Sequence, residues 1–240
     1  MVEDPSDEMK VIHLDLPARR EDLARLELGS AVYLNGLVYT AREGVYKKVL
    51  DEGVPLPMDL RGISNVNFHC SPAAAPDGQG GYRVGAVTAT ASFRFSKWMP
   101  RWIEQTGCSI IIGKGGMPAE DYQRVLAPGG AIYLAILTAM YWAIVTLTTV
   151  GYGTGALLGR GIRRVKEVHW LDELGIAQAM WLFEVQNFGP FIVESDLAGN
   201  SLFARHGEQI NAGIDALYAG LKPPALHRYG ETGNRKDEVM

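Results

Sequence analysis

The chain has 240 residues, and 47% of them are hydrophobic, which is enough for one large domain with a substantial core. Its 23 basic and 27 acidic residues give a net charge of −4, which argues against a general nucleic-acid binder. Two cysteines, Cys70 and Cys108, are too few for a disulfide scaffold or an iron–sulfur cluster, so another chain would have to hold such a centre.

Short strands alternate with helices along the chain, and this order predicts an α/β fold. The predicted strands are rich in apolar, β-branched or small residues and cover 10–16, 31–39, 65–69, 83–91 and 109–112. The second of them contains Asn35-Gly36, a turn signal, so it is either a strand pair or one bent strand. The predicted helices cover 19–26, 41–52, 96–105, 120–126 and 210–221. In the third helix, Trp98 and Trp102 share one face, which is typical of a core stripe.

A long uncharged stretch runs from Val125 to Gly159. Its central part, residues 131–150, is long enough to cross a bilayer as a helix, and basic residues follow it. Several threonines and a Pro-Gly-Gly start oppose that interpretation, so we favour a buried strand over 131–137 that leads into a core helix. The acidic N-terminus lacks the basic region of a targeting signal, and we therefore expect a cytoplasmic protein with no membrane span.

Three turns carry basic side chains suited to an anion. Arg42 lies at the start of the predicted helix over 41–52, whose N-terminus also favours a carboxylate, although an exposed pair with Glu43 fits the spacing too. Arg94 comes shortly after 88–92, a run of small residues rich in hydroxyl groups, and its guanidinium can bind a carboxylate there with two parallel hydrogen bonds. An ordinary edge strand has the same composition. Lys114 follows a predicted buried strand between glycines, either facing a ligand at the sheet edge or solvated on a tight turn.

The histidines give weaker signals. His69 is next to Cys70, but neighbouring strand residues point to opposite faces, so we do not expect a catalytic Cys–His pair. No two histidines have metal-ligand spacing, and we assign no metal site to this chain.

A resemblance to a known family rests on several motifs in a fixed order. Arg42, Thr90, Arg94 and Lys114 resemble the β subunit of class I fumarate hydratases and L(+)-tartrate dehydratases. Residues 40–48 are similar to the family's "tARDxAHkr", residues 88–95 to its "GPTTSxRM" loop and residues 113–116 to its "GKGG". The resemblance covers most of the chain, from about Leu14 to Phe203.

The resemblance implies a fold, an activity and a partner. The fold would be a swivelling β/β/α domain of three layers over 10–206, with a flexible N-terminus over 1–9 and a C-terminal helix and polar tail over 207–240. The chain would be the β subunit of an iron–sulfur-dependent hydro-lyase that adds or removes water on a small 2-hydroxy dicarboxylic acid. A [4Fe–4S] cluster would lie on an α subunit, in a heterodimer or an α2β2 assembly, and this chain would bind no cofactor itself.

The resemblance also assigns roles by position. Arg42, Arg94 and Lys114 would bind substrate carboxylates, and the catalytic hydroxyls would be Thr90, as the base, and Ser92 beside it.

The sequence departs from the family pattern at this same site. Glu43 and Tyr46 replace the family's Asp and His, so an imidazole is missing there. We expect these two residues to support the substrate-binding side chains rather than to contact the substrate. The loop over 88–92 has lost a glycine, a proline and one threonine. These changes leave two alternatives open. One is a repurposed carboxylate-binding or structural subunit without hydratase activity, and the other is a stand-alone enzyme that uses Tyr46 or His69 for acid–base chemistry.

Overall fold

The computed structural model describes residues 9–136 and 154–218. The chain divides into two compact units, Met1–Phe203 and Ala204–Met240. Helix α9 (Leu202–Tyr218) begins in the first unit and provides the described part of the second. It starts eight residues before the predicted helix over 210–221.

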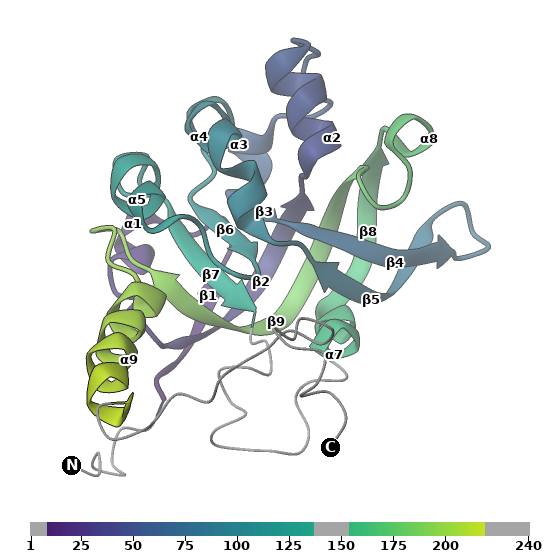
Figure 1. Cartoon of the computed structure of the whole chain (residues 1–240). Helices are drawn as coiled ribbons and strands as arrows, with labels where there is room; N and C mark the ends of the chain where they lie inside the picture. The colour runs from purple at the N-terminus through teal and green to yellow at the C-terminus, as the bar shows by residue number, and fades with distance from the viewer. Residues whose placement is uncertain (1–8, 137–153, 219–240) are drawn as a thin grey trace, which may run out of the picture. The chain divides into compact units, whose positions relative to one another are not determined.

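A seven-stranded sheet forms the centre of the first unit (Figure 1). In spatial order its strands are β1 (Val11–Asp15), β2 (Ala31–Thr40), β3 (Val66–Phe68), β6 (Ile110–Gly113), β7 (Ile132–Ile136), β9 (Met180–Ser195) and β8 (Ile162–His169). Strand β9 also pairs with β2, so β2, β3, β6, β7 and β9 close into a five-strand barrel-like sheet. The predicted α/β class with mixed sheets and helices is therefore confirmed, whereas closure of the sheet was not expected from the sequence.

Strand β2 is one bent strand rather than a strand pair. Its pairing with β9 shifts register on both sides of Leu34. Gly36 has φ +124, and a Cβ atom there would lie 2.9 Å from the Cβ atom of Leu16. The turn signal at Asn35-Gly36 thus marks a bend that only glycine accommodates.

Helices cover the connections between these strands. They are α1 (Arg20–Leu23), α2 (Glu43–Tyr46), α3 (Leu60–Ile63), α4 (Met99–Thr106), α5 (Ala119–Asp121), α7 (Thr154–Gly161) and α8 (Leu171–Leu174). Three are extended by tighter or wider turns, namely the π-helices η1 (Lys47–Asp51) and η3 (Tyr122–Leu126) and the 3-10 helix η2 (Ser92–Trp98). The predicted helices over 41–52, 96–105 and 120–126 correspond to these composite segments.

The central strands of the sheet are buried on both faces. Along β6, Ile110 and Ile112 belong to one hydrophobic cluster, and Ile111 belongs to a second cluster, which also contains Trp98 and Trp102. This alternation explains why β6 reads as a continuous apolar run, because successive strand residues point to opposite faces. The predicted tryptophan stripe is confirmed as core, since both side chains are buried.

Strand β7 confirms the buried strand predicted at the start of the long apolar stretch. The core helix predicted after it lies outside the described residues, as do residues 1–8 and the end of the polar tail. Within the described ranges, no helix is long and apolar enough to cross a membrane.

The strands β4 (Cys70–Pro76) and β5 (Tyr82–Ala89) form a separate antiparallel ribbon, with α7 against β5 (Figure 1). A Cβ atom at Gly159 of α7 would lie 2.5 Å from the carbonyl oxygen of Gly85, so glycine allows the two backbones to approach closely. At the other end of the unit, the carboxylate of buried Glu194 accepts hydrogen bonds from Ser201 Oγ at 2.8 Å and the Phe203 amide at 3.1 Å. These bonds satisfy donors at the start of α9.

Candidate active site

Three neighbouring parallel strands end side by side and present functional residues at one edge. Arg42 follows β2, His69 directly follows β3, and Lys114 directly follows β6. The loop after β5 joins them. The Thr90 amide donates to the His69 carbonyl at 2.7 Å, the Lys114 amide donates to the Thr90 carbonyl, and the Ser92 amide donates to the Lys114 carbonyl, both at 3.2 Å. Carboxyl edges of parallel strands are where ligands bind in open α/β sheets, and here the edge gathers the predicted residues.

Arg42 has a buried nitrogen without a partner. Its Nη1 donates to the Ala177 carbonyl at 2.6 Å and to Ser71 Oγ. Its Nε is buried and has no hydrogen-bond partner in the described part of the chain. Burial and the positive charge of Arg94 both lower the pKa of Arg42. An anion bound here would accept a hydrogen bond from the Arg42 Nε–H group and would offset the repulsion between the guanidinium groups of Arg42 and Arg94.

Arg94 and Lys114 are exposed cations on the same edge. The Arg94 guanidinium lies 5.6 Å from the centre of the Phe95 ring. Within the described residues, no carboxylate lies at salt-bridge distance from Arg42, Arg94 or Lys114. The glycines after Lys114 have φ +73 and φ +70, a left-handed conformation that makes glycine necessary in this loop.

The two candidate hydroxyls have different surroundings. Thr90 is 6% exposed, and its hydroxyl makes no hydrogen bond with any described residue. Ser92 is fully buried, and its Oγ lies 2.7 Å from His69 Nδ1 and 2.8 Å from Tyr133 Oη. A Cβ atom at Gly113 would lie 2.0 Å from Ser92 Oγ, so only glycine leaves room for that hydroxyl.

His69 places a buried imidazole against Tyr46, the residue predicted to stand where the family has histidine. Tyr46 Oη lies 2.8 Å from His69 Nε2. Asn67 Nδ2 donates to Tyr46 Oη at 2.6 Å, and all three side chains are fully buried. Burial, aided by the positive charge of Arg42, lowers the pKa of His69 to about 3, so the imidazole is neutral near pH 7. Burial likewise raises the pKa of Tyr46.

The two residues predicted to support the binding side chains, Glu43 and Tyr46, have different surroundings. Tyr46 takes part in the buried network, whereas Glu43 is exposed and pairs with Lys47 at 2.6 Å, which lowers the pKa of its carboxyl. The exposed Arg42–Glu43 pair allowed by the spacing is not formed. Gln178, instead, accepts a hydrogen bond from the Gly44 amide at 2.7 Å and so fixes the start of α2.

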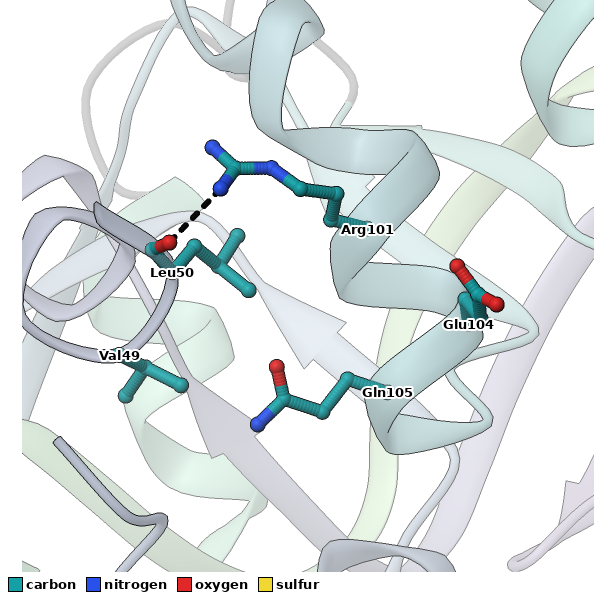
Figure 2. Close-up of a pocket in the computed structure, with 5 residues that line it drawn as sticks. All are labelled: Val49, Leu50, Arg101, Glu104 and Gln105. Carbon is teal, nitrogen blue, oxygen red and sulfur yellow. Dashed lines mark hydrogen bonds between the residues drawn. The ribbon is translucent and has the colours of Figure 1, made fainter. Parts of the chain in front are cut away.

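A pocket of about 330 Å³ has none of these residues in its lining (Figure 2). It is lined by Val49, Leu50, Arg101, Glu104 and Gln105. Arg101 donates to the Leu50 carbonyl at 2.7 Å and forms a salt bridge with Asp51 at 2.7 Å. Because its cation is already paired, this pocket is a poorer anion site than the sheet edge.

The described residues contain no group of three or more His, Cys, Asp or Glu side chains that could hold a metal ion. Cys70 and Cys108 are buried in different hydrophobic clusters, and burial raises the pKa of both thiols, that of Cys108 to about 11. Two separated thiols do not fit an iron–sulfur cluster, whose ligands are thiolates.

Comparison with known proteins gives the chain a family. Residues 1–206 match the family described as "Fumarase C-terminus". The chain is 31% identical over 193 residues to the L(+)-tartrate dehydratase subunit beta of Escherichia coli (strain K12), covering 80% of this chain and 87% of that one. A protein of Methanocaldococcus jannaschii, provisionally named as the same subunit, is 32% identical over 201 residues, with 82% and 94% covered. A protein of Geobacillus stearothermophilus, provisionally named a class I fumarate hydratase, is 31% identical over 195 residues, which are 81% of this chain and 34% of that one. These matches confirm the resemblance inferred from the motifs, and the chain belongs to the Fumarase C-terminus family.

Proposed function

We propose that this chain is the β subunit of an iron–sulfur-dependent hydro-lyase that adds or removes water on a small 2-hydroxy dicarboxylic acid. The observation that carries the proposal is the buried, unpartnered Nε of Arg42 at an edge that also presents Arg94 and Lys114. These three cations have no carboxylate partner among residues 9–136 and 154–218, and such an arrangement suits a ligand with two carboxylates. The names of the relatives, which are tartrate dehydratase subunits and a fumarate hydratase, support the reaction class.

The roles follow from the surroundings of each side chain. Arg42 and Arg94 bind substrate carboxylate, with Lys114 as the third cation. Thr90, in its deprotonated form, is the base that takes a carbon-bound proton. The electrons of that C–H bond form the carbon–carbon double bond, and the hydroxyl group leaves the neighbouring carbon as hydroxide with the electrons of the C–O bond, so that proton and hydroxide together make up the water removed. Ser92 is the second hydroxyl of this loop, two residues after the base.

The proposal needs a partner chain. Relatives named "subunit beta" support the existence of an α subunit, in a heterodimer or an α2β2 assembly. Because the thiols of this chain are buried in separate clusters, we place the [4Fe–4S] cluster of such an enzyme on the α subunit. In this scheme residues 10–206 act as a swivelling β/β/α domain that closes over the substrate, and the enzyme is cytoplasmic.

The test is co-expression with a cluster-bearing α subunit under anaerobic conditions, followed by purification of the complex. Hydration of fumarate and dehydration of L(+)-tartrate, malate and related 2-hydroxy acids are then measured. The proposal expects one of these acids to turn over only when both chains are present. Absence of activity on every dicarboxylate with a fully loaded partner would refute the hydro-lyase, and activity of this chain alone without iron would point to a stand-alone enzyme.

A further inference from the structure

We propose that His69 is a positioning residue. Its ring carries the proton on Nδ1, donates a hydrogen bond to Ser92 and accepts one from Tyr46. In this way it holds the loop that carries Thr90 and Arg94 against the helix that follows Arg42. The inference rests on the proposed function for its effect on substrate, but the hydrogen-bond arrangement can be tested without it.

The direction of the hydrogen bonds is set from Asn67. Its Oδ1 accepts the Ala41 amide at 3.0 Å, so the amide NH2 group faces Tyr46 and donates to Oη at 2.6 Å. The proton of Tyr46 is then available to His69 Nε2 at 2.8 Å. Asn67 Nδ2 also lies 3.4 Å from Nε2, which suits an unprotonated nitrogen and opposes a protonated one. The single proton of the neutral ring is therefore on Nδ1 and points to Ser92 Oγ at 2.7 Å.

This direction is opposite to that of a catalytic Ser–His pair. In such a pair the hydroxyl gives its proton to an imidazole nitrogen that is free to receive it. His69 Nδ1 already carries a proton, and burial keeps the ring neutral, so Ser92 accepts from His69 rather than donating to it. Ser92 therefore supports the loop and is not the base. Thr90, whose hydroxyl makes no hydrogen bond with a described residue, remains the base of the proposed reaction.

His69 also joins three segments that carry candidate substrate-binding residues. The His69 side chain connects Tyr46, four residues after Arg42, with Ser92, two residues before Arg94. Its backbone connects the ends of neighbouring strands, because its amide donates to the Ile112 carbonyl at 2.8 Å and its carbonyl accepts from Thr90. Since these side chains are fully buried, water does not compete for the bonds. Loss of the imidazole would thus relax the spacing between the two arginines.

The first experiment reads the ring directly in the isolated chain. Two-dimensional 1H–15N spectra of protein labelled in the histidine side chains distinguish the Nδ1–H from the Nε2–H tautomer, with a His69→Gln sample for assignment. We expect the Nδ1–H form, unchanged from pH 5.5 to pH 8.5. An Nε2–H ring, or a ring that titrates in this interval, would overturn the proposal whether or not the chain is part of a hydro-lyase.

The second experiment uses the complex with the α subunit and a matched pair of variants. The amide nitrogen of asparagine can take the place of Nδ1, and that of glutamine the place of Nε2. Glutamine does not replace the Nδ1 donor to Ser92, so His69→Gln is expected to raise KM about tenfold or more with a smaller change in kcat. Asparagine replaces that donor, so most of this rise in KM should be absent in His69→Asn. The pH profile of kcat should keep its shape in both variants and in Ser92→Ala.

A shifted limb of that profile, or equal loss in the two His69 variants, would overturn the positioning role. If either His69 variant fails to fold, Tyr46→Phe removes only the hydroxyl that donates to Nε2. It should also raise KM without shifting the profile, and an unchanged KM would contradict the proposal. A complex that is inactive with the unaltered chain counts against the proposed function, and the spectra of the isolated chain still decide the tautomer.

Discussion

Acidification should destabilise this protein in a way that depends on one side chain, His69. Its pKa falls from the ordinary 6.5 to about 3 on folding, because the ring is buried and faces the charge of Arg42. A depressed histidine pKa means that the unfolded chain binds the extra proton first as the pH falls. The contribution to stability is therefore complete above pH 6.5 and is lost progressively toward pH 3. Between pH 7 and pH 5 the free energy of unfolding should fall by about 2 kcal/mol from this group alone, at 1.36 kcal/mol per pH unit below 6.5.

Urea denaturation at pH 7 and pH 5 measures this difference, provided that unfolding is two-state. The unaltered chain should lose about 2 kcal/mol more than His69→Gln over this interval. The matched control is His13→Gln, because His13 is exposed, and it should behave like the unaltered chain. Glu194, whose buried carboxyl has a raised pKa, is common to all three proteins and cancels in the comparison. Equal losses in the unaltered chain and His69→Gln would refute a buried, neutral imidazole.

Two substitutions test the packing around the site and at the start of α9. Gly113→Ala places a Cβ atom 2.0 Å from Ser92 Oγ in a fully buried region, and overpacking of this kind should lower the free energy of unfolding by about 1–3 kcal/mol in urea titrations. Stability unchanged within error would show that this loop is not packed as described. Glu194→Ala removes the carboxylate that accepts two hydrogen bonds before α9, and should cost about 1–2 kcal/mol with a loss of helical circular dichroism. An unaltered spectrum and midpoint would contradict this capping role.

The parts of the fold that sequence patterns predicted are those with strong local signals. Strand β6 was predicted, and the turn signal at Asn35-Gly36 left one bent strand as one of two alternatives, because continuous burial and turn chemistry are visible in a few residues. Strands β4 and β8 were missed for the opposite reason. β4 reads CSPAAAP, with residues that disfavour strands, and β8 reads IRRVKEVH, which resembles a charged surface segment. Each is held by its antiparallel neighbour, so tertiary pairing decides its conformation.

The candidate site shows the same division between local and distant signals. Arg42, Thr90, Arg94 and Lys114 were predicted because each lies in a short motif. His69 was weighed against the neighbouring Cys70 and was named as an alternative acid–base group, but its contacts with Tyr46 and Ser92 were not predicted, because each partner is 23 residues away in sequence. One signal was available. His69 ends a predicted strand in the same way that Lys114 follows another, and adjacent parallel strands bring such residues to one edge.

The most direct measurement of the central claim compares kcat/KM of two arginine variants in the complex with the α subunit. Arg42→Ala removes the guanidinium with the unpartnered nitrogen, and Arg101→Ala removes one that is already paired in the other pocket. We expect Arg42→Ala to lower kcat/KM for the dicarboxylate substrate about a hundredfold, which is the loss of a charge-assisted contact of about 3 kcal/mol. Arg101→Ala should leave kcat/KM within about twofold, since an exposed ion pair contributes little. Equal losses in the two variants, or an unchanged value for Arg42→Ala, would contradict a dicarboxylate site at the edge of this sheet.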